Sequence, residues 1–430
     1  MAKYDIIKDK LEGLGTSLLI GSGVVNSLPA ILSKHNVKKA FVVADKNTYA
    51  AAGECVIQVL EKSGIRTSAF TFGTDILEPN ESAVGAVAMN FDYSVDAIVG
   101  VGSGVINDIC KIIAKMSNKP YAIVATAPSM DGYASATSSM CVGGLKKSLQ
   151  TMCPDIIVGD TDILKKAPIK MMLSGLGDML AKYVAICEWR ISSIINDELY
   201  IEDVADMVRS SLQKCIDNSD GLLCRDEDAV EAVFSGLVLT GAAMNIANCS
   251  RPASGGEHYI SHIIDMRSEE FGTPSDFHGI QCAIATYISV LVYEKLKSLT
   301  PDKARALKYV AEFDYTSWSK ELKDFLGRGA DAMIALEQVE KKYDVSKHAA
   351  RLDRIIEKWQ DIIEIVNQEL PTLSTLEALY DKVGLPKGLD EIGVCTSMLP
   401  LIFKSAKDIR DKYVLPRLCF DLGIIDAIWD

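Results

Sequence analysis

Histidine is rare in this chain, yet three of its five histidines, His258, His262 and His278, lie within 21 positions of one another. In ASGGEHYISH, His258 and His262 are four residues apart after a Gly-Gly pair, so a helix would present both from one face. His278, in DFHGI, comes from a different segment. Imidazoles combined with a carboxylate form a common open site for a divalent Lewis acid, so this cluster is a candidate metal site.

Asp178, in SGLGDMLAKY, is the best carboxylate candidate because a turn-like Gly-x-Gly-Asp run sits inside a helical pattern. Two imidazoles and one carboxylate leave coordination positions for substrate oxygens. The alternative is that each histidine is an ordinary core or capping residue, which is the commoner role for any single one. As a set they shift the balance modestly toward a site, and spacing alone does not separate His258 from His262.

A second candidate site lies where an apolar run ends in a tight glycine turn before a helical pattern. Small residues there allow backbone N–H groups to approach a pyrophosphate at a helix N-terminus. The residues of this turn are Gly102, Ser103, Gly104, Val105 and Ile106. The motif is weak by itself, because the third glycine of GxGxxG is absent and the same triplet at residues 21–23 fits a simple turn before a helix.

Asp45, in VVADKNTY, ends another apolar run, where a carboxylate can accept hydrogen bonds from an adenosine ribose. A helix N-cap or a turn aspartate explains the residue equally well on local grounds. Asp45 favours a free 2′-hydroxyl while Lys46 tolerates a phosphate, so the choice between NAD and NADP stays open.

The elements that must position these residues change character along the chain. Five short apolar runs alternate with helical stretches and predict a parallel, Rossmann-like sheet: KKAFVVAD, RTSAFTFG, DAIVGVGSG, KPYAIVATAP and PDIIVGD. After Asp160 long amphipathic segments replace them. We therefore predict an α/β N-terminal Rossmann-like domain, residues 1–165, and an all-α C-terminal domain, residues 166–430. Within the latter, residues 337–370 fit a solvated helical surface with ion pairs.

Composition narrows the class of function. The net charge of −13 is spread without a basic stripe, which argues against nucleic acid and anionic membranes as partners. The N-terminus lacks a leader pattern and no segment gives about eighteen consecutive apolar residues, so we expect a cytoplasmic protein without membrane insertion. The 11 cysteines are scattered without a CxxC pair, and we expect them to be reduced.

Five ordered motifs, spanning about residues 15–295, make the chain resemble a known family: GSGVINDICK, ATAPSMDGYASATSS, SGLGDMLAKY, SRPASGGEHYISH and DFHGIQCAIAT. It resembles the glycerol-1-phosphate dehydrogenase family, a branch of the dehydroquinate-synthase-like and iron-containing alcohol dehydrogenase superfamily. TAPSMDGY is typical of this branch and not of the plain glycerol dehydrogenases, which favours a phosphorylated substrate. After about residue 300 no motif can be assigned.

The resemblance implies a role for each matching residue. The turn from Gly102 to Ile106 would hold the pyrophosphate, Asp45 would lie by the ribose, and the rest of the dinucleotide site would be lined by Thr126, Ser129 and Ser135. Asp131 would contact substrate near the nicotinamide. The metal ligands would be Asp178, His258 and His278, with Asp178 also near the substrate and His262 facing the substrate.

The implied reaction is metal-assisted reduction of dihydroxyacetone phosphate to glycerol 1-phosphate by NAD(P)H, with Zn²⁺ or Ni²⁺ ahead of Fe²⁺ as the ion. His262 is the candidate proton relay, and Arg251 and Lys182 are candidate phosphate donors, although ordinary cations are the more common role for each. A homo-oligomer is expected. The alternatives are a glycerol or other alcohol dehydrogenase, a sugar-phosphate cyclase of the lyase type, and a non-catalytic binding protein.

Overall fold

A computed structural model describes residues 10–74 and 76–429 of the chain. The first nine residues, which belong to the N-terminal segment used to predict a cytoplasmic protein, lie outside the described part. The chain forms two compact units. Unit 1 comprises the residues up to Val142, Lys147–Met179 and Ser210–Asn248, and unit 2 comprises Gly143–Lys146, Leu180–Arg209 and the residues from Cys249 onward.

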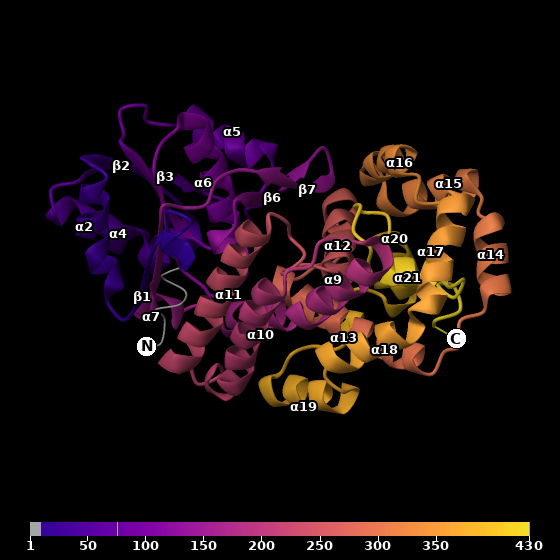
Figure 1. The fold of residues 1–430 in the computed structure, drawn as a ribbon. Helices are drawn as coiled ribbons and strands as arrows, with labels where there is room; N and C mark the ends of the chain where they lie inside the picture. The colour runs from indigo at the N-terminus through magenta and orange to yellow at the C-terminus, as the bar shows by residue number, and fades with distance from the viewer. Residues whose placement is uncertain (1–9, 75, 430) are drawn as a thin grey trace. The chain divides into compact units, whose positions relative to one another are not determined.

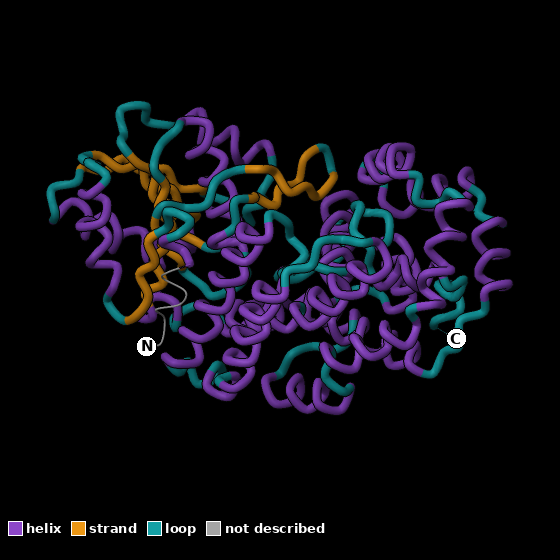
Figure 2. Tube along the Cα trace, viewed as in Figure 1, coloured by secondary structure: helices purple, strands orange, loops and turns teal. Residues whose placement is uncertain are grey.

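Unit 1 contains a six-stranded parallel sheet with the strand order β1-β8-β5-β4-β2-β3. The strands gather in one region of Figures 1 and 2. They are β1 (Ser17–Gly21), β2 (Lys39–Asp45), β3 (Arg66–Phe72), β4 (Ala97–Gly102), β5 (Tyr121–Ala125) and β8 (Ile156–Asp160). All five predicted runs are strands. The additional strand β1 was not predicted, nor was the hairpin formed by β6 (Thr137–Val142) and β7 (Leu145–Gln150).

The sheet is apolar on both faces, as a parallel sheet covered by helices must be. Alternate residues of β2, such as Val42, share one core with leucines of α2 and α4, including Leu32 and Leu60. The intervening residues, such as Phe41, are also buried. The helices of unit 1 are α2 (Leu28–Lys34), α3 (Lys46–Thr48), α4 (Glu54–Lys62), α5 (Glu81–Met89), α6 (Gly104–Ser117), α7 (Thr161–Leu164), most of α8 (Ile169–Leu180) and α11 (Glu227–Ala247).

Unit 2 is helical, and no strand follows Asp160 among the described residues. Helix α10 (Glu202–Asp217) runs from unit 2 into unit 1. The helices of unit 2 are α9 (Lys182–Asn196), α12 (Gly256–Phe271), α13 (His278–Lys297), α14 (Lys303–Ala311), α15 (Tyr315–Leu326), α16 (Gly329–Glu340), α17 (Val345–Glu357), α18 (Trp359–Glu369), α19 (Leu373–Val383), α20 (Leu399–Ala406) and α21 (Leu415–Asp421). The fold class is therefore as predicted, an α/β N-terminal part followed by a helical part.

The division into two units does not follow the predicted domains, 1–165 and 166–430, which stay a prediction. Residues 210–248 pack with the sheet although they lie far beyond residue 165 in the sequence. The reason is visible in α11, whose Phe234 ring contacts the ring of Tyr133 at a centroid distance of 5.2 Å. A change from strands to helices along the sequence marks a change of element type, and packing decides which elements form one unit.

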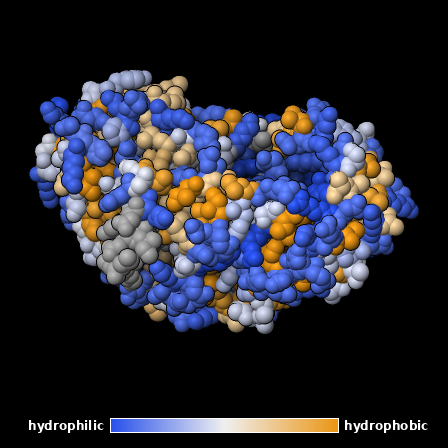
Figure 3. All heavy atoms as spheres, viewed as in Figure 1, coloured by the Kyte–Doolittle hydropathy of each residue, from blue (hydrophilic) through white to orange (hydrophobic). Residues whose placement is uncertain are grey.

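Helix α11 is the one described helix long and apolar enough to cross a membrane by length and composition. That test is weak, because the core helix of a soluble protein passes it as well, and 78% of its most apolar window is buried inside the protein. Hydrophilic residues cover most of the face shown in Figure 3, with hydrophobic residues in separate patches.

Candidate active site

The predicted glycine turn connects β4 to α6 in unit 1. Gly102 is the last residue of β4, Ser103 is the N-cap of α6, and Gly104 is its first helical residue. A Cβ on Gly102 would come within 2.6 Å of the Cβ and Cγ1 atoms of Ile106, so the turn requires glycine there. The N-terminal N–H groups of a 14-residue helix thus begin directly after a buried strand, which is the arrangement that binds phosphate groups.

Three predicted cofactor residues lie at the carboxyl ends of neighbouring strands. In the register, Ala44 of β2 pairs with Val101 of β4, and Gly102 pairs with Ala125 of β5. Asp45, Gly102 and Thr126 therefore sit along one edge of the sheet. The chain order reverses between β2 and β4, and nucleotides bind in open α/β sheets at such a switch point.

Asp45 also has the local role that its sequence suggested. Its Oδ1 accepts hydrogen bonds from the backbone N–H groups of Asn47 at 2.8 Å and Thr48 at 2.9 Å, so it caps α3. A cap uses one carboxylate oxygen and fixes the orientation of the other. Contact with a ribose stays a prediction.

The remaining predicted cofactor residues, Ser129 and Ser135, are buried in the loop and 3₁₀ turn after β5. The Oγ of Ser135 donates to the carbonyl of Thr137 at 3.0 Å and accepts from Nζ of Lys111 at 3.2 Å. Lys111 also donates to the carbonyl of Gly132 at 2.7 Å. This network shows that Ser135 has a structural function, whether or not it also touches a nucleotide.

Asp131 and Asp178 are brought together in unit 1. The N–H of Asp131 donates to Oδ2 of Asp178 at 2.9 Å. The approach depends on Gly175 of α8, where a Cβ would lie 1.8 Å from the carbonyl oxygen of Pro128. The Gly-x-Gly-Asp run lies entirely within helix α8. Its first glycine, Gly175, allows α8 to pack closely against the loop backbone that precedes Asp131.

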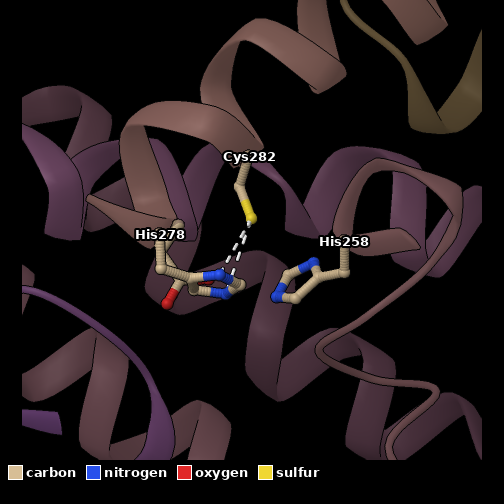
Figure 4. Close-up of side chains that lie close together, drawn as sticks. His258, His278 and Cys282 are labelled. Carbon is tan, nitrogen blue, oxygen red and sulfur yellow. Dashed lines mark hydrogen bonds between the residues drawn. The ribbon is translucent and has the colours of Figure 1, made fainter. Parts of the chain in front are cut away.

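The clustered histidines come from two helices of unit 2. His258 and His262 are one turn apart on α12, and His278 is the first residue of α13. The ring centroids of His258 and His278 are 5.0 Å apart, and Figure 4 shows the two rings pointing toward one another. The predicted common face of His258 and His262 is present in the helix, with ring centroids 6.4 Å apart.

Cys282, one turn further along α13, completes this cluster and was not singled out from the sequence. Its Sγ lies 3.5 Å from Nε2 of His278 (Figure 4). The ligand-type atoms of His258, His278 and Cys282 all lie within 4.8 Å of one another, a spacing that could hold a metal ion. Burial raises the pKa of the Cys282 thiol, but the two histidines outweigh it, so the pKa lies below its ordinary value. The i,i+4 spacing of His278 and Cys282 was the available signal.

Neighbouring polar groups orient the histidine rings. Nδ1 of His258 is hydrogen-bonded to Oε1 of Glu257 at 2.7 Å, and Nδ1 of His278 to Oγ of Ser261 at 3.2 Å. Carboxylates and hydroxyls of this kind fix the tautomer of metal-binding imidazoles. With Nδ1 so engaged, Nε2 is the donor that His258 would present to a metal.

His262 has different surroundings from His258. Its ring is nearly parallel to that of His278, with centroids 5.9 Å apart, and its ligand-type atom groups with those of Asp265 and His278. Burial lowers the pKa of His262 well below its ordinary value, and the positive charges of Arg410 and nearby groups act in the same direction. The ring is therefore neutral at physiological pH, and either of its nitrogens can be the donor.

The two cations suggested as phosphate donors are buried and form hydrogen bonds within unit 2. The guanidinium of Arg251 is 2% exposed; it donates to both carboxylate oxygens of Glu198 and to the carbonyl of Tyr413. Lys182 is fully buried and donates to the carbonyl of Ala253 at 3.0 Å. These contacts give both side chains the structural role that is more common for such cations, and phosphate binding by either stays a prediction.

Comparisons with known proteins agree with this architecture. Residues 19–168 match the family model of iron-containing alcohol dehydrogenase. The structure is similar to that of a glycerol dehydrogenase from Schizosaccharomyces pombe, with a TM-score of 0.61 and 16% identity over 96% of this chain and 89% of the other. At that identity the likeness concerns the fold alone, and it confirms the predicted fold class.

Sequence relatives are more specific. A glycerol-1-phosphate dehydrogenase of Bacillus velezensis, with NAD(P)+ in its name, is 33% identical over 310 residues, which are 69% of this chain and 77% of the relative. One from Halalkalibacterium halodurans is 27% identical over 93% of this chain and 90% of the relative. The latter match extends beyond residues 15–295, so the resemblance also includes helical sequence without an assigned motif. The chain belongs to the glycerol-1-phosphate dehydrogenase family.

Proposed function

We propose that this protein is an NAD(P)-dependent glycerol-1-phosphate dehydrogenase that reversibly reduces dihydroxyacetone phosphate. The observation that carries the proposal is the 33% identity over 69% of the chain with a relative that bears this name. A nucleotide-type strand edge in unit 1 and a donor cluster in unit 2 support it, because hydride transfer to a carbonyl needs both a nicotinamide and a positive site for the developing charge.

The cofactor residues act mainly through backbone. In this proposal the turn from Gly102 to Ile106 holds the pyrophosphate against the N-terminus of α6. Asp45 accepts hydrogen bonds from the ribose while its capping bonds hold it in place. The rest of the site is lined by Thr126, Ser129 and Ser135. The bound nicotinamide supplies the hydride.

The donor set of unit 2 fits a divalent metal. Glu257 holds the tautomer of His258, and Ser261 holds the ring of His278, as expected for imidazole ligands. We propose His258 and His278 as ligands, with Asp178 supplying the carboxylate. The sulfur of Cys282 beside both rings favours the softer ions Zn²⁺ and Ni²⁺ over Fe²⁺. Such an ion supplies Lewis acidity toward the C2 carbonyl oxygen.

His262 and Asp131 are proposed to act on the substrate. Because His262 is neutral and buried, its free ring nitrogen can accept the proton of the C2 hydroxyl in the oxidation direction, and the imidazolium so formed can return that proton in the reduction direction. Asp131 is held by the bond from its N–H to Asp178, which positions the 3₁₀ turn that it caps. A homo-oligomer in the cytoplasm, without nucleic acid or membrane partners, is part of the same proposal.

The test is oxidation of NADH and NADPH by the metal-loaded protein with dihydroxyacetone phosphate, followed by chiral analysis of the product. We expect net oxidation and glycerol 1-phosphate. Equal catalytic efficiency on glycerol and on glycerol 1-phosphate would favour a plain glycerol dehydrogenase. Conversion of a sugar phosphate without net change in NADH absorbance would favour a cyclase.

A further inference from the structure

Seven buried polar side-chain atoms of unit 2 lack a hydrogen-bond partner among the described residues, and two of them are Nδ1 of His262 and one terminal nitrogen, NH2, of Arg410. The whole His262 side chain is 94% buried, since it is 6% exposed. Buried polar groups in native proteins are almost always paired, so each unpaired atom needs an explanation, and a bound ligand is one. Arg410 as a residue is only partly buried, although this terminal nitrogen is buried.

The two groups are close enough for the charge of one to act on the other. The positive charge of Arg410 acts on His262, and so does that of Lys146 in β7. A further cation, Lys412, donates to the carbonyl of Ser254 at 2.7 Å. Burial and the charges of Arg251 and Arg410 lower the pKa of Lys412 to about 7. Positive charge is therefore crowded around Arg410, in a protein whose net charge is −13.

Three other arginines of unit 2 show how this fold normally treats a buried guanidinium. Each is paired with a carboxylate: Arg251 with Glu198 at 2.5 Å, Arg351 with Asp421 at 2.6 Å, and Arg417 with Asp408 at 2.8 Å. No described carboxylate forms an ion pair with Arg410. Its segment, between α20 and α21, is nevertheless anchored, because Nζ of Lys342 donates to the carbonyl of Arg410. The backbone of Arg410 is therefore fixed, while its guanidinium has no ion pair with a described carboxylate.

The surroundings of Arg410 indicate which kind of anion it could bind. The His262 ring lies nearly parallel to that of His278, and the charge of Arg410 acts on His262, so Arg410 belongs to the surroundings of the proposed reaction site. A phosphate dianion offers several acceptor oxygens, and an arginine fork together with an imidazole N–H matches them well.

We propose that Arg410 and the Nδ1–H of His262, assisted by Lys146, bind the phosphate group of the substrate. The identity of the substrate rests on the proposed function; the anion site rests on the orphaned groups and the unpaired charge. Arg410 is then the residue that separates a phosphorylated three-carbon substrate from glycerol.

The experiment compares Arg410→Met with Arg305→Met, which removes the same charge from an exposed arginine of α14 in the same unit. We expect Arg410→Met to raise the KM for dihydroxyacetone phosphate about 10- to 100-fold. The inhibition constant of inorganic phosphate should rise in parallel, while the KM for NADH and the bound metal stay unchanged. Arg305→Met should match the unmodified protein in all four.

Equal KM and phosphate inhibition in the two variants would overturn the proposal. If circular dichroism shows that Arg410→Met does not fold, Arg410→Lys takes its place, because lysine keeps the charge without the fork. An intermediate rise in KM and in the phosphate inhibition constant supports the site, and unchanged values overturn it.

Failure of the proposed function is separable from failure of the anion site. If the unmodified protein does not reduce dihydroxyacetone phosphate, calorimetric titration with inorganic phosphate still decides. Binding that is lost in Arg410→Met and kept in Arg305→Met supports an anion site for another phosphorylated substrate. No binding by the unmodified protein, or equal binding by both variants, overturns the inference.

Discussion

Two regions of the protein offer binding groups of different kinds. The turn between β4 and α6 in unit 1 offers backbone groups, and the histidine cluster of unit 2 offers side chains. In the turn, Gly102 must lack a side chain, and the groups that it offers are backbone N–H groups of α6. In the cluster, the side chains of His258, His278 and Cys282 converge from two helices, and Glu257 orients one of them.

This difference indicates which kind of change should disrupt each region. The turn depends on local backbone geometry and carries no ionisable group in Gly102–Ile106, so steric changes should affect it and pH should not. The cluster depends on ring orientation and on buried carboxylates, so changes of charge and tautomer should affect it. Changing one region and measuring both, for a proposed metal ligand and then for the glycine turn, tests this difference.

Removing a proposed ligand should have the largest effect. His258→Ala should abolish tight metal binding and lower turnover more than about a thousandfold, because the metal's contribution to the barrier is several kcal/mol. Elemental analysis measures the bound metal, and NADH oxidation measures turnover. The affinity for NADH should be unchanged. His35→Ala, at an exposed histidine after α2, is the control. Retention of metal and turnover in His258→Ala would remove this residue from the ligand set.

A side chain in the turn should affect the other region alone. Gly102→Ala places a methyl group 2.6 Å from Ile106, which must displace the start of α6 and weaken NADH binding about a hundredfold. Fluorescence titration measures the affinity, and bound metal should stay unchanged. Gly85→Ala in α5 is the matched control, because a Cβ there meets no atom within 4 Å. Equal NADH affinity in both variants would contradict the proposed pyrophosphate site.

Altering the group that orients a ligand should have a smaller effect than removing the ligand. Glu257→Gln removes the charge that holds His258, and we expect metal affinity to fall about 10- to 50-fold. Competition with a chelator measures it, with the exposed Glu269→Gln of the same helix as control. If Glu257→Gln binds metal as tightly as the control, Glu257 serves only the packing of α12.

The smallest effect concerns the pH dependence of stability. Burial and the negative charge of Glu257 raise the pKa of Glu188 from 4.5 to about 8. The folded state therefore holds this proton more tightly than the unfolded state, so the contribution to stability is complete below pH 4.5 and is lost as the pH rises toward 8. We expect the Tm to fall by about 5 °C between pH 5 and pH 8 for this reason.

Glu188→Gln should flatten the slope of Tm against pH, because glutamine does not titrate. The slope is compared instead of the Tm itself, because glutamine offers one acceptor oxygen where Glu188 uses two, for Gly256 and Leu415, and the Tm will therefore also change. The exposed Glu312→Gln should keep the slope of the unmodified protein. An equal slope in Glu188→Gln would show that the buried carboxyl does not take up a proton in this range.

Much of the fold was predictable because its signals are local. The runs at β2, β3, β4, β5 and β8 are continuous and apolar, as buried parallel strands are, and all five are strands. Strand β1 was missed because its Gly-Ser-Gly ending was attributed to a turn before a helix. The hairpin of β6 and β7 was missed because its residues are mostly polar or small and lack a strong alternation.

The candidate site divides in the same way. The glycine turn and the His258–His262 pair could be recognised because their members are close in sequence. For Arg251 and Lys182 the sequence left two roles open, since closeness in sequence does not show which partners a cation meets. Arg410 had no signal in the sequence, because its significance comes from the lack of an ion pair with any described carboxylate.

Five of the sheet strands, the helical character of the later part, the glycine turn and the family followed from the sequence alone, since these depend on local patterns and on ordered motifs. Tertiary packing decided that helix α11 belongs with the sheet, that Cys282 lies beside two histidines, and that Arg410 forms no ion pair with a described carboxylate. The physical reason is that propensity and spacing act between residues a few positions apart. Burial, ion pairing and ligand geometry depend on neighbours that folding alone brings together.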